Sequence, residues 1–461
     1  MAACIENLQK DRRKMNSHKV ASFFAGIGGF DLGFEEAGFE VNFQCELQEF
    51  CGVVLRKHWP EIQSATDILA LDPSVIPRAD IWCGGFPCQD LSVARGSLGR
   101  RGLNGARSGL FYRFAELARE RKPKVILLEN VQGLLSSNNG KDFAELLHTL
   151  ASMKYAVSWR LLNSRYFGVP QSRPRVYICA WLNDPVACGN VLFENRPPMP
   201  AANERSAFIE TSWEYGTGPI APRVAFCLAA TSGRHTGTDW SRTYIAYKDE
   251  VRRMTPLECE RLQGFPDGWT ETGQTVLGAE KSDSLRYHAL GNAVSVAVVR
   301  WVASRIGEQL RASAFEDGKR ISRRTFLAEC VQHFAGLSGA GQISGELDAA
   351  RASDEKFLWP NAGILWDGAF VANRTPPSIG EPVESDLLDL IEPARPDARY
   401  FLSSNAAEGI LRRVDTQGRH LFLPLRKALE RLSGREPKMV QPARTRPQME
   451  FQLAEPECAL L

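Results

Sequence analysis

The chain has 461 residues, too many for one ordinary domain, so we expect two or three domains with separate hydrophobic cores. Its formal net charge of +2 excludes a strong overall field, and any attraction to nucleic acid must come from local patches. The eleven cysteines form no C-x-x-C pair, which argues against structural zinc and a disulfide framework, and no apolar run reaches membrane-spanning length. We therefore expect a cytoplasmic protein that binds neither metal nor membrane.

The first half of the chain alternates short β-branched runs with amphipathic stretches, as in a parallel sheet that has helices on both faces. The predicted strands are Val20–Phe24, Phe39–Cys45, Ile81–Cys83, Lys124–Leu128, Tyr155–Leu162 and Val176–Trp181. The predicted helices are Phe30–Ala37, Leu110–Arg119 and Phe143–Ser152. This pattern indicates an α/β protein with a doubly wound, mostly parallel sheet.

Changes in composition divide the rest of the chain. Residues 184–250 are rich in Pro, Gly, Ser, Thr and aromatics, which predicts a small irregular domain after a first domain of residues 1–183. Residues 251–311 end in a helix from Val294 onward and are expected to return to the first domain. Residues 312–461 form a C-terminal extension of unknown role, with helical patches at Phe326–Phe334 and Ala406–Leu432 and a predicted disordered tail from Arg435.

Glycines and carboxylates follow the first strands. In an open parallel sheet, ligands bind beyond the carboxyl ends of the strands. Residues 24–30 read F-A-G-I-G-G-F, and Glu46 follows about twenty residues later, where a carboxylate can hold a ribose diol. Asp67 is a candidate acceptor for an adenine amino group. A glycine turn alone is as often a tight connection, and G-I-G-G departs from G-x-G-x-x-G, so the pattern favours S-adenosylmethionine over a nicotinamide or flavin.

A cysteine and a carboxylate follow the next two predicted strands. Cys88 lies in G-G-F-P-C-Q, at residues 84–89, on a turn at the expected ligand-binding edge. A lone cysteine is more often a buried apolar residue, but the flanking Gly, Pro and polar residues favour a nucleophile here. Glu129 emerges at the same edge, and its position there favours a catalytic carboxyl over a surface acid or helix cap.

These motifs together resemble the cytosine-5 DNA methyltransferases of the bacterial or phage type. The motifs occur in the same order as in that family: F-A-G-I-G-G-F, G-G-F-P-C-Q, E-N-V at 129–131, Q-S-R-P-R at 171–175 and G-N-A-V at 291–294. The resemblance covers roughly residues 20–310, and the most specific part is P-C-Q with E-N-V and Q-x-R-x-R. It implies a Rossmann-like methyltransferase fold, a target-recognition domain at residues 184–250, S-adenosylmethionine as cofactor, and methyl transfer to carbon 5 of cytosine in duplex DNA.

The implied reaction explains why these residue types are needed. Carbon 5 of cytosine is a poor nucleophile, and a thiolate added to carbon 6 makes the ring an enamine that can attack a methyl group. Cys88 would supply the thiolate, Glu129 a hydrogen bond or proton at ring nitrogen 3, and Arg175, with Arg173 nearby, a contact to the carbonyl oxygen. Carbon 5 then loses its proton to water or hydroxide and the thiolate leaves. The expected cofactor-binding residues are Phe24, Gly26, Gly28, Gly29, Glu46, Asp67, Ile68, Pro87, Leu110 and Asn292.

The reacting carbon of a duplex lies inside the base stack, so such an enzyme must flip the base out. Residues 92–108 contain four arginines, spaced glycines and no acid, and we expect a lid that closes on DNA; a solvated flexible loop is the alternative. In the small domain, two arginines flank a Gly/Thr-rich loop suited to reading base edges. The predicted DNA-binding residues are Gln89, Ser92, Arg95, Arg100, Arg101, Arg107, Arg234 and Arg242.

Two other functions fit the same architecture. An RNA cytosine methyltransferase is disfavoured by the long insert before Val251 and by Gln-Asp-Leu-Ser after Cys88. A non-catalytic DNA-binding homologue is disfavoured because the candidate catalytic and cofactor residues are all present. We expect a monomer that acts on double-stranded DNA, with a restriction endonuclease of the same target site as a candidate partner.

Overall fold

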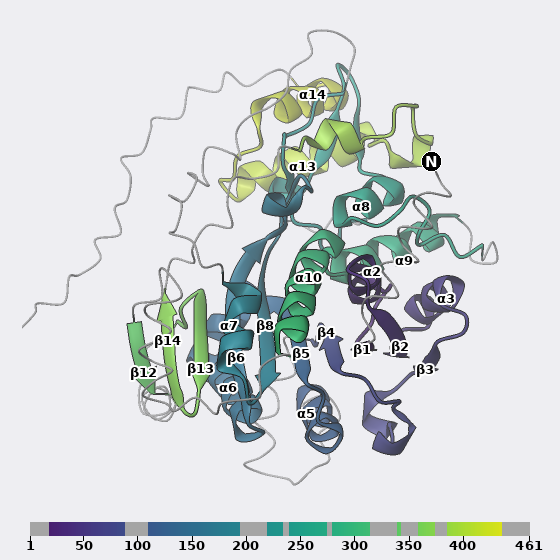
Figure 1. Cartoon of the computed structure of the whole chain (residues 1–461). Coiled ribbons are helices and arrows are strands. Elements are labelled where there is room, and N and C mark those ends of the chain that lie inside the picture. The colour runs from purple at the N-terminus through teal and green to yellow at the C-terminus, as the bar shows by residue number, and fades with distance from the viewer. Residues whose placement is uncertain are drawn as a thin grey trace, which may run out of the picture.

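The computed structural model describes residues 18–87, 109–193, 219–233, 239–273, 279–313, 339–342, 358–373 and 385–435. A large sheet covered by helices forms one part of the molecule, and a smaller unit lies above it (Figure 1). The sheet has ten strands in the order β12-β14-β13-β6-β8-β5-β4-β1-β2-β3. No helix within these described ranges is long and apolar enough to cross a membrane.

The parallel half of the sheet carries the ligand-binding edge. It consists of β1 (Lys19–Phe23), β2 (Glu40–Cys45), β3 (Gln63–Ala65), β4 (Ile81–Gly84) and β5 (Val125–Val131). These five strands pair in parallel, so their carboxyl ends meet at one edge. The predicted strands are confirmed here to within a few residues, with β3 as an additional short strand.

The other half of the sheet is antiparallel, which corrects the expectation of a mostly parallel sheet. β8 (Pro174–Leu182) lies between β5 and β6 (Tyr155–Asn163) and runs antiparallel to both. Beyond β6 lie β13 (Ala362–Trp366), β14 (Ala369–Asn373) and β12 (Gly339–Gln342), all paired antiparallel. The cause is connection length, because β6–β8 and β13–β14 are joined by segments too short for a parallel crossover. The α/β class is confirmed, and the sheet is mixed with a parallel core.

Helices cover both faces of the sheet. On one face pack α2 (Gly29–Glu36), α7 (Pro185–Leu192) and α10 (Val296–Ser313); on the other pack α5 (Leu110–Arg121) and α6 (Lys141–Ser152). Successive residues of a strand pack against opposite helix layers. In β4, Trp82 packs against α5, while Ile81 and Cys83 lie on the side of α2. A third core joins α3 (Glu49–His58) to α8 (Pro256–Gln263) and α9 (Ala279–Asn292).

Helix α7 packs on the catalytic sheet. Its residues Val191 and Leu192 are buried in the same core as Ile306 of α10, and the domain boundary expected at residue 184 stays a prediction. The small domain, which we define as the described residues from 219 to 253, contains β9 (Ala225–Phe226), β10 (Tyr244–Ala246) and β11 (Val251–Arg253). Strand β9 pairs with β7 (Gln171–Ser172).

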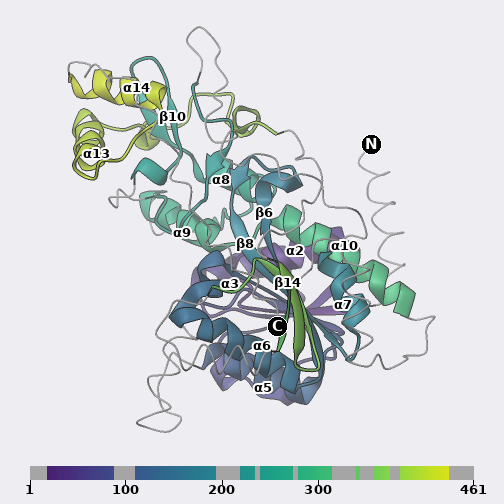
Figure 2. The ribbon, with the colours of Figure 1, turned by 90° about the vertical axis from the view of Figure 1, so that its left-hand side faces the viewer.

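The C-terminal extension contributes to both parts of the molecule. Its strands β13 and β14 continue the catalytic sheet, and its helices α13 (Ser404–Thr416) and α14 (Leu423–Ser433) pack on the small domain (Figures 1 and 2). The helical patch predicted at Ala406–Leu432 is thus two helices, while the patch at Phe326–Phe334 and the predicted tail beyond Arg435 lie outside the described residues. The described residues also form short 3₁₀ segments: η1 (Ile68–Ala70), η2 (Pro73–Val75), η3 (Gln132–Gly140), η4 (Ser164–Phe167), η6 (Asp239–Ser241), η8 (Leu387–Leu390) and η9 (Ala398–Tyr400).

Candidate active site

A cavity of about 390 Å³ opens at the carboxyl ends of β1, β2, β4 and β5. Eleven of the predicted catalytic and cofactor-binding residues line it, and they come from separate parts of the chain. They are Phe24, Gly26, Glu46, Asp67, Ile68, Pro87, Leu110, Glu129, Arg173, Arg175 and Asn292. The structure therefore brings together residues nearly 270 positions apart, as expected for the edge of an open α/β sheet.

Glu46 is held at this edge by backbone amides. Its carboxylate accepts hydrogen bonds from the amides of Gly26 and Gln48, each at 2.7 Å. Burial raises the pKa of Glu46, and the hydrogen bonds from these amides oppose that rise. A Cβ added to Gly26, whose φ is +56°, would meet no atom within 4 Å. The first turn thus leaves open space beside a fixed carboxylate, where a bound ligand fits.

Asp67 and Ile68 line the next part of the cavity. Asp67 caps η1, with its side chain accepting a hydrogen bond of 2.9 Å from the amide of Leu69. Ile68 is buried and offers an apolar surface. A flat ring bound there would meet an apolar side chain and a carboxylate together, a combination suited to an adenine.

Glu129 and Arg175 form a charged pair deep in the cavity. Arg175 Nε lies 3.1 Å from Glu129 Oε1, yet that oxygen has no hydrogen-bond partner among the described residues. Burial raises the pKa of Glu129, and the neighbouring charges of Arg175 and Arg173 oppose the rise. Because a buried carboxyl oxygen without a partner is costly, a hydrogen-bonding ligand group would be favoured here.

Arg173 borders the cavity but is directed into the protein. Its terminal nitrogens donate to the carbonyl oxygens of Leu228, Gly291 and Ala293 at 2.9, 3.1 and 2.7 Å. These bonds tie the residue that precedes β8 to the small domain and to the C-terminal end of α9, where Asn292 lies. Both terminal nitrogens of Arg173 are thus engaged by backbone carbonyls, which favours a positioning role for this residue, and its contact with a substrate stays a prediction.

Two predicted glycines also serve packing and do not line the cavity. A Cβ on Gly28 would lie 2.3 Å from the ring of Trp59, and one on Gly29 would lie 2.7 Å from Val294. Their small size thus lets α2 approach α3 and the return segment closely. Whether the backbone of Gly28 or Gly29 also contacts the cofactor stays a prediction.

Several lining residues were missed by the sequence analysis. Asn130 is the most informative, since its side-chain amide donates to the carbonyl of Phe86 at 2.8 Å and so fixes the segment that ends at Pro87. Its place in E-N-V was a usable signal. Leu47 is an apolar lining residue that is 68% exposed. The other missed residues are Cys45, Gln48, Cys51, Thr66, Gly85, Phe86, Val131, Ala289 and Gly291.

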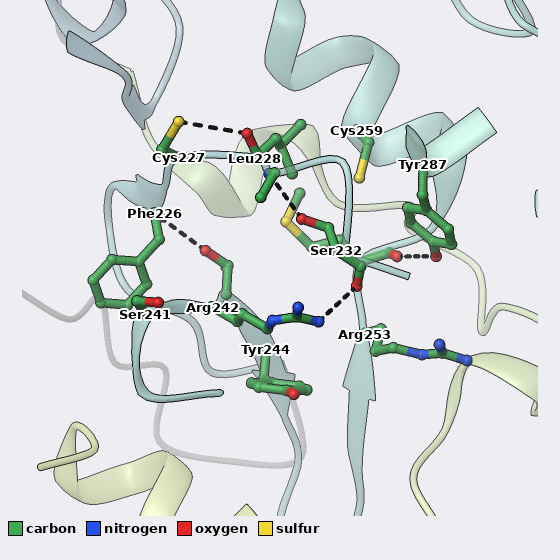
Figure 3. A pocket seen from close by; sticks show the side chains of 13 residues that line it. Phe226, Cys227, Leu228, Ser232, Ser241, Arg242, Tyr244, Arg253, Cys259 and Tyr287 are labelled. Atoms are coloured by element: carbon green, nitrogen blue, oxygen red, sulfur yellow. Dashed lines mark hydrogen bonds between the residues drawn. The ribbon is translucent and has the colours of Figure 1, made fainter. Parts of the chain in front are cut away.

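The remaining predicted residues lie elsewhere. Arg242 lines a second, smaller cavity of about 90 Å³ in the small domain, where it donates to the carbonyl of Ser232 (Figure 3). It also donates to Thr231 Oγ1. The described residues contain no cluster of His, Cys, Asp and Glu suited to a metal ion. Outside the described residues are Cys88, Gln89, Ser92, Arg95, Arg100, Arg101, Arg107 and Arg234.

Several known proteins are similar to this chain in sequence or in fold. The family model described as C-5 cytosine-specific DNA methylase matches residues 18–211 and 212–308. The type II methyltransferase M2.BsuMI of Bacillus subtilis is 31% identical over 322 residues, covering 66% of this chain and 79% of that protein. M.NgoBI of Neisseria gonorrhoeae is 32% identical over 274 residues, covering 54% of this chain and 83% of that protein. Among solved structures, the Dnmt2 methyltransferase of S. pombe covers 64% of this chain and 99% of that protein, with 19% identity and a TM-score of 0.48.

Proposed function

Because this chain belongs to the C-5 cytosine-specific DNA methylase family and is a DNA (cytosine-5)-methyltransferase, we propose that it methylates cytosine in a specific duplex sequence through covalent catalysis by Cys88. The observation that carries the proposal is the convergence of Glu46, Glu129, Arg175 and Asn292 on one cavity. The cavity thus contains a fixed carboxylate that can accept hydrogen bonds from a ligand diol, and a buried carboxyl group that can donate to a nucleobase.

The family uses S-adenosylmethionine as methyl donor, and the cavity residues fit that molecule. Glu46 would accept hydrogen bonds from the ribose hydroxyls, while Asp67 and Ile68 would hold the adenine. Phe24, Gly26, Pro87, Leu110 and Asn292 would complete the cofactor contacts. When bound, S-adenosylmethionine supplies an electrophilic methyl group.

Cys88 is the proposed nucleophile, and the other cysteines at the cavity are poor candidates. Burial raises the pKa of Cys45 and of Cys51 to about 12, so both stay thiols at neutral pH. Pro87, which lines the cavity, precedes Cys88 directly in the sequence. The Cys88 thiolate would add to carbon 6 of the flipped cytosine and leave again after carbon 5 has gained the methyl group and lost its proton.

Glu129 and Arg175 would act on the base during this addition. Electron density moves from carbon 6 toward ring nitrogen 3 as the thiolate adds, so a protonated Glu129 would donate there. Arg175 would donate to the carbonyl oxygen beside it and would place positive charge near the thiolate. The raised pKa of Glu129 supports this role, because burial favours the protonated carboxyl.

The biological setting is also part of the proposal. The relatives that match are named type II methyltransferases, so we place this chain in a restriction-modification setting, where a restriction endonuclease would act on the same site. We propose a monomer on double-stranded DNA, since one chain contains the whole cavity. The lid arginines after Cys88, together with Arg234 and Arg242, would hold the duplex.

A methylation assay tests the activity and its substrate together. The purified full chain would be incubated with methyl-tritiated S-adenosylmethionine and either duplex DNA or transfer RNA. We expect label in DNA alone, recovered as 5-methylcytosine, and sequencing of the methylated DNA would give the target. Label in RNA alone would overturn the assignment of duplex DNA as substrate.

A mechanism-based trap tests the nucleophile. Duplex DNA with 5-fluorocytosine at the target should become covalently attached, because fluorine cannot leave as a proton does. Cys88→Ala should abolish attachment, while the control Cys51→Ala, which changes a cavity cysteine with a thiol pKa of about 12, should retain it. Attachment that survives Cys88→Ala would show that another group is the nucleophile.

A further inference from the structure

The C-terminal helix pair, which we define as α13, α14 and the turn between them, is fixed to the small domain. Ile410, Leu411 and Leu429 are buried against Tyr244 and Val251 of β10 and β11. Arg413 Nε lies 2.9 Å from the buried Asp239 carboxylate, which adds a charged contact. The helix pair is therefore packed firmly on the small domain (Figure 2).

The exposed side of this pair is basic. Between residues 403 and 435 the sequence has seven Lys and Arg but three Asp and Glu, an excess of four positive charges against +2 for the whole chain. All three acids are paired within the helices: Asp415 and Glu430 with Arg426, each at 2.9 Å, and Glu408 with Arg435 at 3.5 Å. Their negative charges are thus largely neutralised locally.

Several cations remain directed to solvent. Arg412, Arg419 and Lys427 are exposed, and none of them pairs with a carboxylate of the described residues. The exposed Arg431 contacts only the carbonyl of Lys248 at 3.1 Å, again within the described part of the chain. A surface of this kind attracts a polyanion, because its charges are not cancelled by neighbouring acids.

The turn between the helices lies beside η6, the segment that directly precedes the predicted DNA-binding residue Arg242. The Arg419 guanidinium lies over the ring of Trp240, with its central carbon 4.4 Å from the ring centroid. Trp240 lies in η6, two residues before Arg242. A duplex that reaches Arg242 would therefore pass close to the basic turn.

We propose that the C-terminal helix pair binds the phosphate backbone of duplex DNA flanking the target sequence. Arg412, Arg419, Lys427 and Arg431 would contact phosphates without reading bases, which would lengthen the DNA footprint and hold the small domain on the duplex. The inference rests on the proposed action on duplex DNA, and it assigns a role to a region outside the family match, which ends at residue 308.

The test compares two double variants of the full chain. Arg412→Gln with Lys427→Gln removes two exposed charges of the helix pair, whereas the matched control, Arg119→Gln with Lys122→Gln, removes two exposed charges at the opposite end of α5 from the cavity. Dissociation constants would be measured by fluorescence anisotropy at several salt concentrations, on target duplexes of increasing length up to about 30 base pairs.

On the longest duplex the helix-pair variant should bind about tenfold more weakly, and its slope of log affinity against log salt should fall by up to about 1.8, since each phosphate contact contributes about 0.9. The penalty should vanish on the shortest duplexes, and kcat at saturating DNA should be unchanged. Equal affinities and salt slopes for both variants at every length would overturn the inference. The dissociation constants are measured without any methylation step. A parent chain that binds DNA but does not methylate it would therefore contradict the proposed function and not this inference.

Discussion

Single residues divide into those that a motif identifies and those whose role depends on side-chain direction. Glu46 and Glu129 could be assigned from sequence because a carboxylate directly after a parallel strand must emerge at the ligand edge. Arg173 lies directly before β8 and Arg175 lies within it, and only the structure shows that the side chain of Arg173 is directed into the cavity wall. Sequence alone cannot decide between them, since the direction depends on which carbonyl groups the return segment presents.

Replacing Glu129 tests its role as a proton or hydrogen-bond donor. Glu129→Gln should lower kcat by about 10²–10⁴-fold, because the amide cannot supply the proton. In the parent, kcat should fall as pH rises through the raised pKa of Glu129, since only the protonated carboxyl donates. That high-pH loss should be absent in the variant. A pH–rate profile over the range in which the variant stays folded checks both effects, and identical profiles would remove Glu129 from the proton step.

Two methionine substitutions separate positioning from catalysis. Arg173→Met should destabilise the protein by about 3 kcal/mol or more, because three backbone carbonyl groups lose their donor in a buried region. Arg175→Met should cost less stability and more kcat, since it loses a single backbone contact, to Pro174, and the buried Glu129 that it leaves unpaired can stay protonated. Urea unfolding and single-turnover rates would measure the two effects. The opposite ranking would return Arg173 to the catalytic set.

Among the secondary-structure elements, the C-terminal hairpin was the least foreseen, although its signal was present. Asp367 and Gly368 have φ of +48° and +78°, and they join two apolar five-residue strands. Asp-Gly between apolar runs is a strong hairpin signal. The elements of the first domain were predictable because their apolar periodicity is long and regular. No periodicity specifies that β13 pairs with β6, which lies 200 residues earlier.

The junction of α2 with β1 and β2 contains a buried carboxyl that should make stability depend on pH. Burial raises the pKa of Asp31 to about 6, against hydrogen bonds from Gln44 and Ser22. The folded protein therefore binds this proton more tightly than the unfolded chain, so its stability should fall as pH rises from about 4 to about 6 and then level off. Asp31→Asn should remove the fall and stabilise the protein at neutral pH by up to about 3 kcal/mol.

Chemical denaturation between pH 4 and pH 8 would measure that effect, with Asp249→Asn as the control at an exposed carboxyl. Asparagine can still accept from Gln44 and donate to Ser22, so the junction should keep its hydrogen bonds. A variant that is less stable than the parent at neutral pH would show that the ionised carboxylate contributes more to the junction than its burial costs.

At the scale of the whole molecule, the C-terminal extension connects parts that the family match leaves separate. Its strand β13 covers the edge of β6, and Trp359 packs against Trp159 and Phe143 in the core of the sheet. The same extension reaches the small domain and α9, where Arg399 Nε lies 3.0 Å from an oxygen of Asp283. Sequence could divide the chain by composition but could not show these contacts, because they join segments that have no shared periodicity.

Removing the extension should therefore destabilise the catalytic domain as well as the small one. A chain that ends at residue 338 would expose the unpaired edge of β6 and the apolar residues of two cores, among them Trp159 and Tyr244. We expect it to aggregate or to unfold well below the parent's Tm, whereas a chain that ends at Arg435 keeps every contact described and should match the parent. Thermal unfolding and soluble yield of both truncations would decide this. If the chain that ends at residue 338 were stable and active, the packing of the extension would be dispensable for the fold. The role of the extension would then be limited to binding DNA.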